Sequence, residues 1–190
     1  MLLTWSGAEA SSHTNLCLCV PFSLSGGTGM LVVFEGLVCC LVVLLSCVTG
    51  IADGAHNMAF FYDKEVQKRA VASGLISEER IRRNYKLFKL CGILPYFVFV
   101  IISVFVINKA RGFLNCFLQL TAILLIEGIF DRFFIDWYWV NHTGAWIIPG
   151  TEDLRPYIDK KAWIQKWTGT LVGFPLIAAV IAGIGSLIAK

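Results

Sequence analysis

The chain alternates between long apolar runs and short polar connections. Four of the runs reach about 20 residues, which is the length that an α-helix needs to cross a hydrocarbon core of about 30 Å. They are residues 30–52, 87–107, 113–134 and 168–189. The pattern predicts an all-α, polytopic membrane protein in which four transmembrane helices form one domain, residues 30–190.

The connection between the first two runs has the pattern of a helical hairpin. Asp63 is placed to cap a short helix that stops at Gly74, and Ser77, followed by Glu78 and Glu79, is placed to cap a second helix. The second helix can continue directly into the next apolar run. We therefore expect a hairpin of two short helices at the membrane surface.

Residues 1–29 contain no Lys or Arg and end in the stretch SLSGGTG. A secretory signal peptide has a basic segment before its apolar core, and this segment has none. The sequence predicts a flexible tail here. Met30 stands at the edge of the first apolar run and is a candidate start of translation, in which case the tail is not part of the native protein.

Composition supports the bilayer as the solvent of this chain. Hydrophobic residues make up 57% of the sequence and charged residues 15%, whereas about 25% of the residues of a soluble domain are charged. The net charge of +3 is too small to indicate a nucleic-acid partner. The seven cysteines form no CxxC motif, so we interpret them as small apolar residues.

The placement of the basic residues predicts the orientation. With four spans, 13 of the 16 Lys and Arg residues lie on the side of loops 53–86 and 135–167, and three lie on the other side. Loops rich in Lys and Arg stay in the cytoplasm. We therefore expect both loops to be cytoplasmic, both termini to be non-cytoplasmic, and the protein to be a multi-pass protein of the cell membrane.

Residues 128–153, GIFDRFFIDWYWVNHTGAWIIPGTED, contain the densest polar chemistry. Their tryptophans and tyrosine are typical of an aromatic belt at a membrane interface. Arg132 and Asp136 are four residues apart and are expected to form an ion pair. The acidic loop can also dock on the basic hairpin through Trp146, Ile147 and Ile148.

A metal site is an alternative interpretation of the same segment. The candidate metal ligands are Asp131, Asp136 and Asp153, and the candidate catalytic residues are Asp131, Asp136, His142 and Glu152. Carboxylate oxygens with one imidazole suit a divalent cation such as Mg²⁺ or Mn²⁺. This hypothesis predicts a metal-dependent enzyme that acts on a lipid headgroup at the cytoplasmic interface.

Four polar residues are expected inside the membrane, where they are costly unless they are paired or functional. They are Glu35, Asn115, Gln119 and Glu127. If they line one path, the protein is a subunit of an oligomeric transporter. The last run also contains the small-residue pairs Gly169 with Gly173 and Ala179 with Gly183, a spacing that allows close packing of helices within the chain or against a partner subunit.

The sequence contains no P-loop, GxSxG, HExxH or CxxC motif. The leading hypothesis is therefore a non-enzymatic accessory or assembly subunit of a larger membrane system. Its expected partners are the lipid bilayer and another membrane subunit or a second copy of the chain. The lipid-headgroup enzyme and the oligomeric transporter are the two alternatives.

Overall fold

The structure is a computed structural model that describes residues 26–188. Within this range every regular element of secondary structure is a helix, and four helices are long and apolar enough to cross a membrane. They are Gly27–Ile51, Glu78–Ile107, Phe113–Val140 and Lys160–Leu187. The predicted all-α class and the four apolar helices are confirmed. The tail predicted over residues 1–29 lies outside the described residues except for its last four, which belong to the first helix.

The first two long helices and the segments between them follow one another in a simple order. α1 (Gly26–Ile51) is the first long helix, and the 3₁₀ segment η1 (Ala55–Phe61) and the short helix α2 (Lys64–Ala72) come next. The second long helix consists of four segments without a break: α3 (Glu78–Phe88), the π-helical turn η2 (Lys89–Ile93), α4 (Leu94–Ile102) and the π-helical turn η3 (Ser103–Ile107).

The third long helix consists of α5 (Phe113–Phe130) and the π-helical segment η4 (Asp131–Val140). A loop with one 3₁₀ turn, η5 (Glu152–Leu154), leads to the fourth long helix. That helix consists of α6 (Lys160–Thr168), the π-helical turn η6 (Gly169–Gly173) and α7 (Phe174–Ile188).

Local chemistry explains where the short helices begin. The backbone N–H of Arg80 donates to Ser77 Oγ (3.2 Å), which caps α3 as its sequence predicted. Asp63 occupies the N-cap position of α2, although its side chain makes no capping hydrogen bond. Gly74 has a positive φ of 75°, which lets the chain turn from α2 toward α3.

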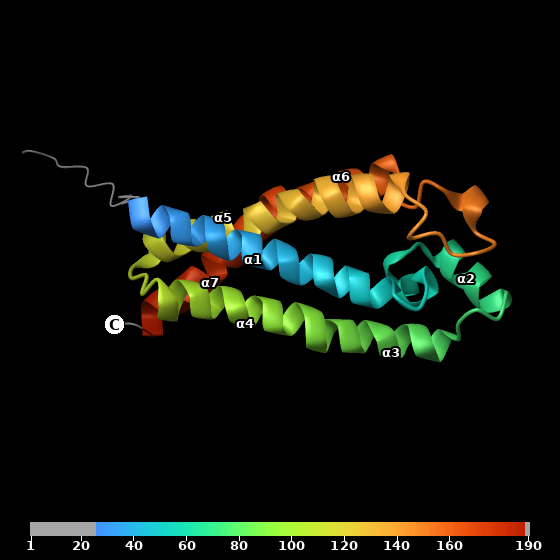
Figure 1. Ribbon diagram of the computed structural model, residues 1–190. Coiled ribbons are helices and arrows are strands. Elements are labelled where there is room, and N and C mark those ends of the chain that lie inside the picture. The colour runs from blue at the N-terminus through green and yellow to red at the C-terminus, as the bar shows by residue number, and fades with distance from the viewer. Residues whose placement is uncertain (1–25, 189–190) are drawn as a thin grey trace, which may run out of the picture.

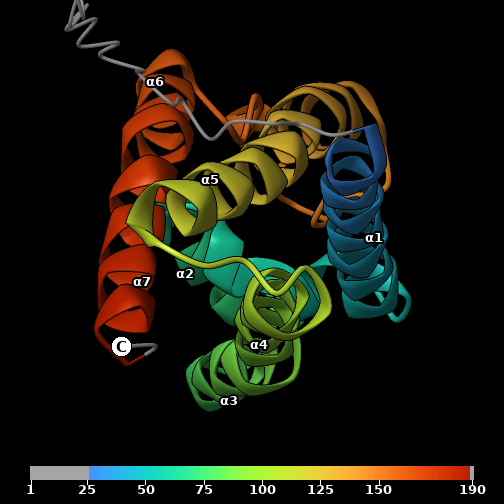
Figure 2. The same ribbon diagram turned by 90° about the vertical axis from the view of Figure 1, so that its left-hand side faces the viewer.

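α5 is the central helix of the bundle and packs extensively against α1 and α7. Leu120, Ile123 and Leu124 of α5 are fully buried in the cluster between these helices. Gly128 permits close approach of the fourth long helix, because a Cβ there would lie 2.6 Å from Thr170 Cγ2 and 2.7 Å from Phe174 Cε2. Figure 2 shows the four long helices arranged around a centre, with α2 beyond it.

A second apolar cluster joins the polar connections at one end of the bundle. We call η1, α2 and residues 141–159 the cap. Tyr62 donates a hydrogen bond from its hydroxyl to the backbone oxygen of Trp146 (2.6 Å), and Trp146 and Ile148 are buried in the cluster. Burial raises the pKa of Tyr62, so the hydroxyl keeps the proton that it donates.

A salt bridge also joins the two parts of the cap. Arg69 Nη1 donates to Asp153 Oδ1 (2.6 Å), and this hydrogen bond holds the pKa of Asp153 below its ordinary value. The acidic loop thus lies on the basic hairpin, with apolar contacts from Trp146 and Ile148 beside the ion pair.

The second long helix separates from the other long helices along part of its length. α4 makes few contacts with α1 and α5, and in Figure 1 α3 and α6 lie on opposite sides of the bundle where they approach the cap. Near the other end the second and fourth long helices meet, since Gly185 of α7 packs against the Phe105 ring of η3. The second long helix therefore diverges from the fourth toward the cap.

Candidate functional site

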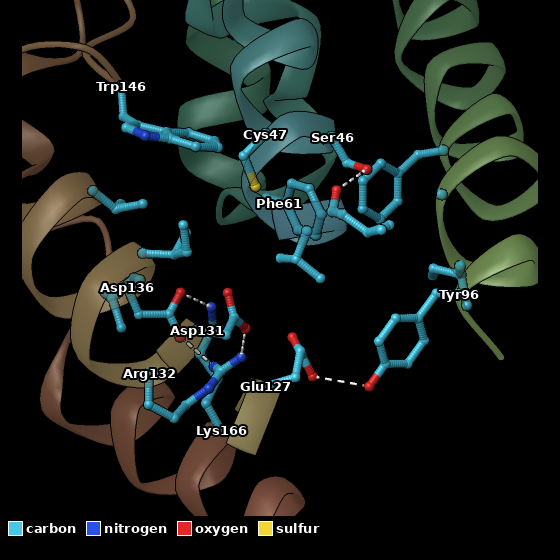
Figure 3. A pocket seen from close by; sticks show the side chains of 18 of the residues that line it. Ser46, Cys47, Phe61, Tyr96, Glu127, Asp131, Arg132, Asp136, Trp146 and Lys166 are labelled. Carbon is cyan, nitrogen blue, oxygen red and sulfur yellow. Dashed lines mark hydrogen bonds and ion pairs between the residues drawn. The ribbon is translucent and has the colours of Figure 1, made fainter. Parts of the chain in front are cut away.

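A cavity of about 330 Å³ lies between the long helices, directly beside the cap. Residues of all four long helices and of the cap line it (Figure 3). Most of its wall is apolar and aromatic. The apolar lining includes Val42, Val43, Phe61, Phe88, Phe97, Ile135, Trp146 and Phe174.

One wall of the cavity carries four charged side chains in a single network. The guanidinium of Arg132 pairs with the carboxylates of both Asp131 and Asp136, and Lys166 Nζ donates to Asp136 Oδ1 (2.6 Å). The ion pair between Arg132 and Asp136 that the sequence predicted is present. Two acids and two cations balance, so the network as a whole carries no net charge. We call it the charge network.

The charge network depends on two different helices. Asp131, Arg132 and Asp136 lie on η4, where the third long helix continues beyond the predicted end at residue 134. Lys166 lies on α6, which extends the fourth helix before its predicted start at residue 168. Both helices continue because the charged side chains at their ends find partners in one another, which offsets the cost of burying them.

Glu127 lies one turn from the charge network on α5 and outside it. Its side chain is buried, with 6% of the residue exposed, and the Tyr96 hydroxyl donates to Glu127 Oε2 (3.1 Å). Among the described residues no Lys, Arg or His forms a salt bridge with Glu127. Figure 3 shows Tyr96 and Glu127 pointing toward each other from α4 and α5. The cavity thus holds one buried carboxyl group that forms no salt bridge with a basic side chain of the described residues.

The other polar residues expected inside the membrane form a separate cluster. Asn108 Nδ2 donates to Glu35 Oε2 (2.9 Å) and to Gln119 Oε1 (3.0 Å), and Gln119 Nε2 donates to Asn115 Oδ1 (3.0 Å). Gln119 and Glu127 are eight residues apart on α5, which corresponds to about 12 Å along the helix axis. Because buried Ile123 and Leu124 lie between them, the four predicted residues do not line one continuous polar path.

The five residues predicted to converge on a divalent cation do not meet at one point. Asp131 and Asp136 pair with Arg132 at the cavity, whereas Asp153 pairs with Arg69 on the surface of the cap. His142 Nδ1 is 2.5 Å from the backbone oxygen of Trp137, and Glu152 Oε1 accepts from the backbone N–H of Gly150 (3.2 Å). Across residues 26–188, no group of three His, Cys, Asp or Glu side chains is arranged to hold a metal ion.

The predicted small-residue pairs do not pack against other helices of the described chain. A Cβ built on Gly169, Gly173 or Gly183 would meet no atom within 4 Å. The glycines at close contacts are different ones: Gly36 lies against Ile126, Gly128 against Thr170 and Phe174, and Gly185 against Phe105. Ala179 is half-buried, while the neighbouring Ala178 and Ala182 are fully buried.

Three residues of these polar sites were not singled out by the sequence reasoning. Tyr96 is separated from Glu127 by 31 positions, and Lys166 from Asp136 by 30. Asn108 follows the second apolar run, where a polar residue is ordinary. The one available signal was the hydroxyl of Tyr96 directly after Pro95 in the apolar run LPYFVFV.

No protein-family model, curated protein or solved structure matches the chain.

Proposed function

We propose that this protein binds a hydrophobic cation inside the membrane, as the ligand-binding subunit of a membrane transporter. The observation that carries the proposal is the buried carboxyl group of Glu127, which forms no salt bridge among the described residues and lies in an apolar, aromatic cavity. A buried carboxylate is costly without a positive partner. A ligand with a positive charge and an apolar body would supply both the partner and the apolar contact.

The rest of the cavity favours the same class of ligand. Arg132 and Lys166 are already paired with acids, so they offer little attraction to an anionic ligand. The aromatic rings of Tyr96 and Phe97 line the cavity beside Glu127, and aromatic faces attract cations. A volume of about 330 Å³ falls at the lower end of the range for small-molecule sites, about 300–1,000 Å³.

The packing of the second long helix suggests how such a ligand reaches the cavity. Leu90, Ile93 and Leu94 of η2 and α4 expose their side chains, and the helix makes few contacts with its neighbours at this level. The Tyr96–Glu127 hydrogen bond is the polar link across the cavity between the second and third long helices. An amphipathic cation in the bilayer can compete with Tyr96 for Glu127 and enter between the helices.

Equilibrium binding of tetraphenylphosphonium to the purified protein tests this function. We expect saturable binding that Glu127→Gln weakens at least about tenfold, corresponding to about 1.4 kcal/mol. Glu35→Gln is the matched control, because it neutralises a buried carboxylate outside the cavity. Equal binding to Glu127→Gln and the wild type, or equal losses in both variants, would contradict the proposal.

The orientation in the membrane is part of the proposal. We infer that the cap faces the cytoplasm of the cell and that both termini face away from it, because 13 of the 16 basic residues lie on the side of loops 53–86 and 135–167. Alkaline phosphatase fused after Lys190 should be active, since this enzyme folds only outside the cytoplasm. An inactive phosphatase together with a fluorescent GFP fusion at the same site would reverse the orientation.

A second candidate function is that of an accessory or assembly subunit. Gly169, Gly173 and Gly183 support it, because a face of small residues that no other described helix covers permits close packing of a partner helix. Native purification is expected to give an oligomer or a co-purifying membrane subunit. Gly173→Leu is expected to weaken this association. A monomer under all mild conditions would count against this function.

A further inference from the structure

A second buried polar site lies toward the end of the bundle opposite the cap. Five residues form it: Glu35 of α1, Ser103 of η3, Asn108 after η3, and Asn115 and Gln119 of α5. We call them the Glu35 cluster. Glu35 is 3% exposed, Ser103 is fully buried and Gln119 is 7% exposed. The proposed function does not use this cluster, which is separated from the cavity by apolar side chains of α5.

The internal hydrogen bonds of the Glu35 cluster leave several oxygen atoms without partners. Asn108 Nδ2 donates to Glu35 Oε2 and Gln119 Oε1, and Gln119 Nε2 donates to Asn115 Oδ1. Three enclosed atoms have no partner among the described residues: Glu35 Oε1, Ser103 Oγ and Asn108 Oδ1. Such atoms are rare in folded proteins, and each one requires an explanation such as a bound ion or water.

Asn108 contacts both of the other residues that carry these atoms. The side chain of Asn108 is hydrogen-bonded to Glu35, and the backbone N–H of Asn108 donates to the backbone oxygen of Ser103 (2.8 Å). Asn108 directly follows the C-terminus of η3. The last carbonyl groups of a helix lack helical partners and carry partial negative charge, so this location also favours a cation.

The charge of the Glu35 cluster also favours a cation. Among the described residues, no Lys, Arg or His forms a salt bridge with Glu35. The other side chains of the cluster are neutral amides and a hydroxyl. An ionised Glu35 in this position would leave one uncompensated negative charge in an apolar surrounding, which is strongly unfavourable.

We propose that the Glu35 cluster is a binding site for one Na⁺ ion, with Glu35 Oε1, Asn108 Oδ1 and Ser103 Oγ as ligands. A single carboxylate with neutral oxygen ligands matches a monovalent ion, whereas protein sites for Ca²⁺ use several carboxylates. Na⁺ needs fewer oxygen ligands than K⁺. A proton on Glu35 would cancel the charge but could engage only one of the remaining oxygens. Helix C-terminal ends coordinate Na⁺ in membrane transporters in a similar way.

Thermal unfolding of the purified full-length protein in detergent tests the site. We expect Tm to rise by at least about 2 °C when choline chloride is replaced by NaCl at equal ionic strength, because an ion that binds the native state stabilises it. KCl should give a smaller rise. Glu35→Gln should lose the response, and Glu127→Gln, which neutralises the carboxylate in the cavity, should retain it.

Binding of ²²Na⁺ to the wild-type protein provides a measurement that does not depend on the folding of a variant. We expect saturable binding that NaCl displaces and choline chloride does not. The absence of saturable binding, a Tm rise of equal size with KCl or choline chloride, or an undiminished rise in Glu35→Gln would overturn the Na⁺ site. Loss of the Na⁺ response would leave the binding of tetraphenylphosphonium intact, so the two proposals fail separately.

Discussion

At the scale of single residues, Tyr62 shows how one hydroxyl can hold two distant segments together. It lies 84 positions from Trp146, whose backbone oxygen accepts its hydrogen bond. Its ring also packs edge-on against Tyr157, with ring centroids 4.9 Å apart. Tyr62, Trp146 and Tyr157 all line the cavity. The contact that closes the cap therefore also shapes the wall of the candidate site.

Tyr62→Phe tests this contact without removing the ring. We expect it to lower the free energy of unfolding by about 1–3 kcal/mol, because the Trp146 carbonyl is left enclosed without its donor. Thermal unfolding in detergent measures the change. Tyr138→Phe is the matched control, since Tyr138 is 51% exposed. Equal stability of the wild type and both variants would contradict the role given to the Tyr62 hydroxyl.

The Arg69–Asp153 salt bridge predicts a pH-dependent contribution to stability. Its hydrogen bond lowers the pKa of Asp153 from the ordinary 3.8. The pair therefore stabilises the native state fully at pH values above that ordinary pKa. That contribution is lost as the pH falls through the lowered pKa, where Asp153 takes up a proton. Asp153→Asn should therefore lower Tm slightly at pH 7 and no longer change it at a pH below that pKa.

Salt provides the control for the same pair. Both side chains are exposed, so high ionic strength should screen their attraction and reduce the effect of Asp153→Asn at pH 7. Melting curves over pH and NaCl concentration measure both trends. A difference between variant and wild type that is constant over the whole pH range would show that the pair does not act through its charge.

At the scale of the helices, the packing of α5 against the fourth long helix depends on Gly128. Gly128→Ala should lower the free energy of unfolding by about 1–3 kcal/mol, because the added Cβ overlaps the side chains of Thr170 and Phe174. Gly173→Ala is the matched control. It adds the same methyl group where no atom lies within 4 Å, and alanine favours helix. Thermal unfolding of both variants is the measurement, and equal losses would contradict the assigned contact.

The sequence predicted the number of long helices because apolar length alone decides it. The sequence predicted the third and fourth helices to be shorter than they are. Asp131, Arg132 and Asp136 resemble the polar end of a helix when they are considered without Lys166. The spacing of glycines along the sequence also did not predict which of them lie at close helix contacts. Gly169 and Gly173 have the spacing of a packing motif and pack against no described helix, whereas isolated Gly128 is enclosed.

The candidate sites depended on contacts that sequence spacing cannot supply. Glu35 and Glu127 were identified as polar residues inside the membrane, but their partners are distant in sequence: Tyr96 lies in the second long helix and Asn108 directly after it. The predicted transporter path joined Glu127 to Gln119 along α5. In the structure the buried side chains of Ile123 and Leu124 lie between them.

At the scale of the whole molecule, the charge network adds polar links between the third and fourth long helices beside the cavity. Asp136 is its central member, with bonds to both Arg132 and Lys166. Asp136→Asn would leave Arg132 and Lys166, both partly buried, with Asp131 as the one carboxylate of the network. We expect a loss of roughly 3 kcal/mol of unfolding free energy, at the lower end for a buried ion pair because Lys166 is partly exposed.

Thermal unfolding measures this loss, and Asp53→Asn is the control at an exposed carboxylate without a salt bridge among the described residues. A second comparison, Asp136→Asn combined with Lys166→Met, should recover part of the stability, because it removes the cation that the first change leaves unpaired. A double variant less stable than Asp136→Asn alone would show that Lys166 stabilises the bundle by other contacts.

The charge network also has a consequence for the biosynthesis of the protein. The third long helix brings Asp131, Arg132 and Asp136, and the cation that completes their balance, Lys166, is synthesised 30 residues after Asp136. Until the fourth helix emerges, the third would lack one cation partner for its two carboxylates at the end beside the cap. The two helices are therefore expected to leave the insertion machinery as a pair, and a nascent chain that ends before Lys166 is expected to stay at the translocon.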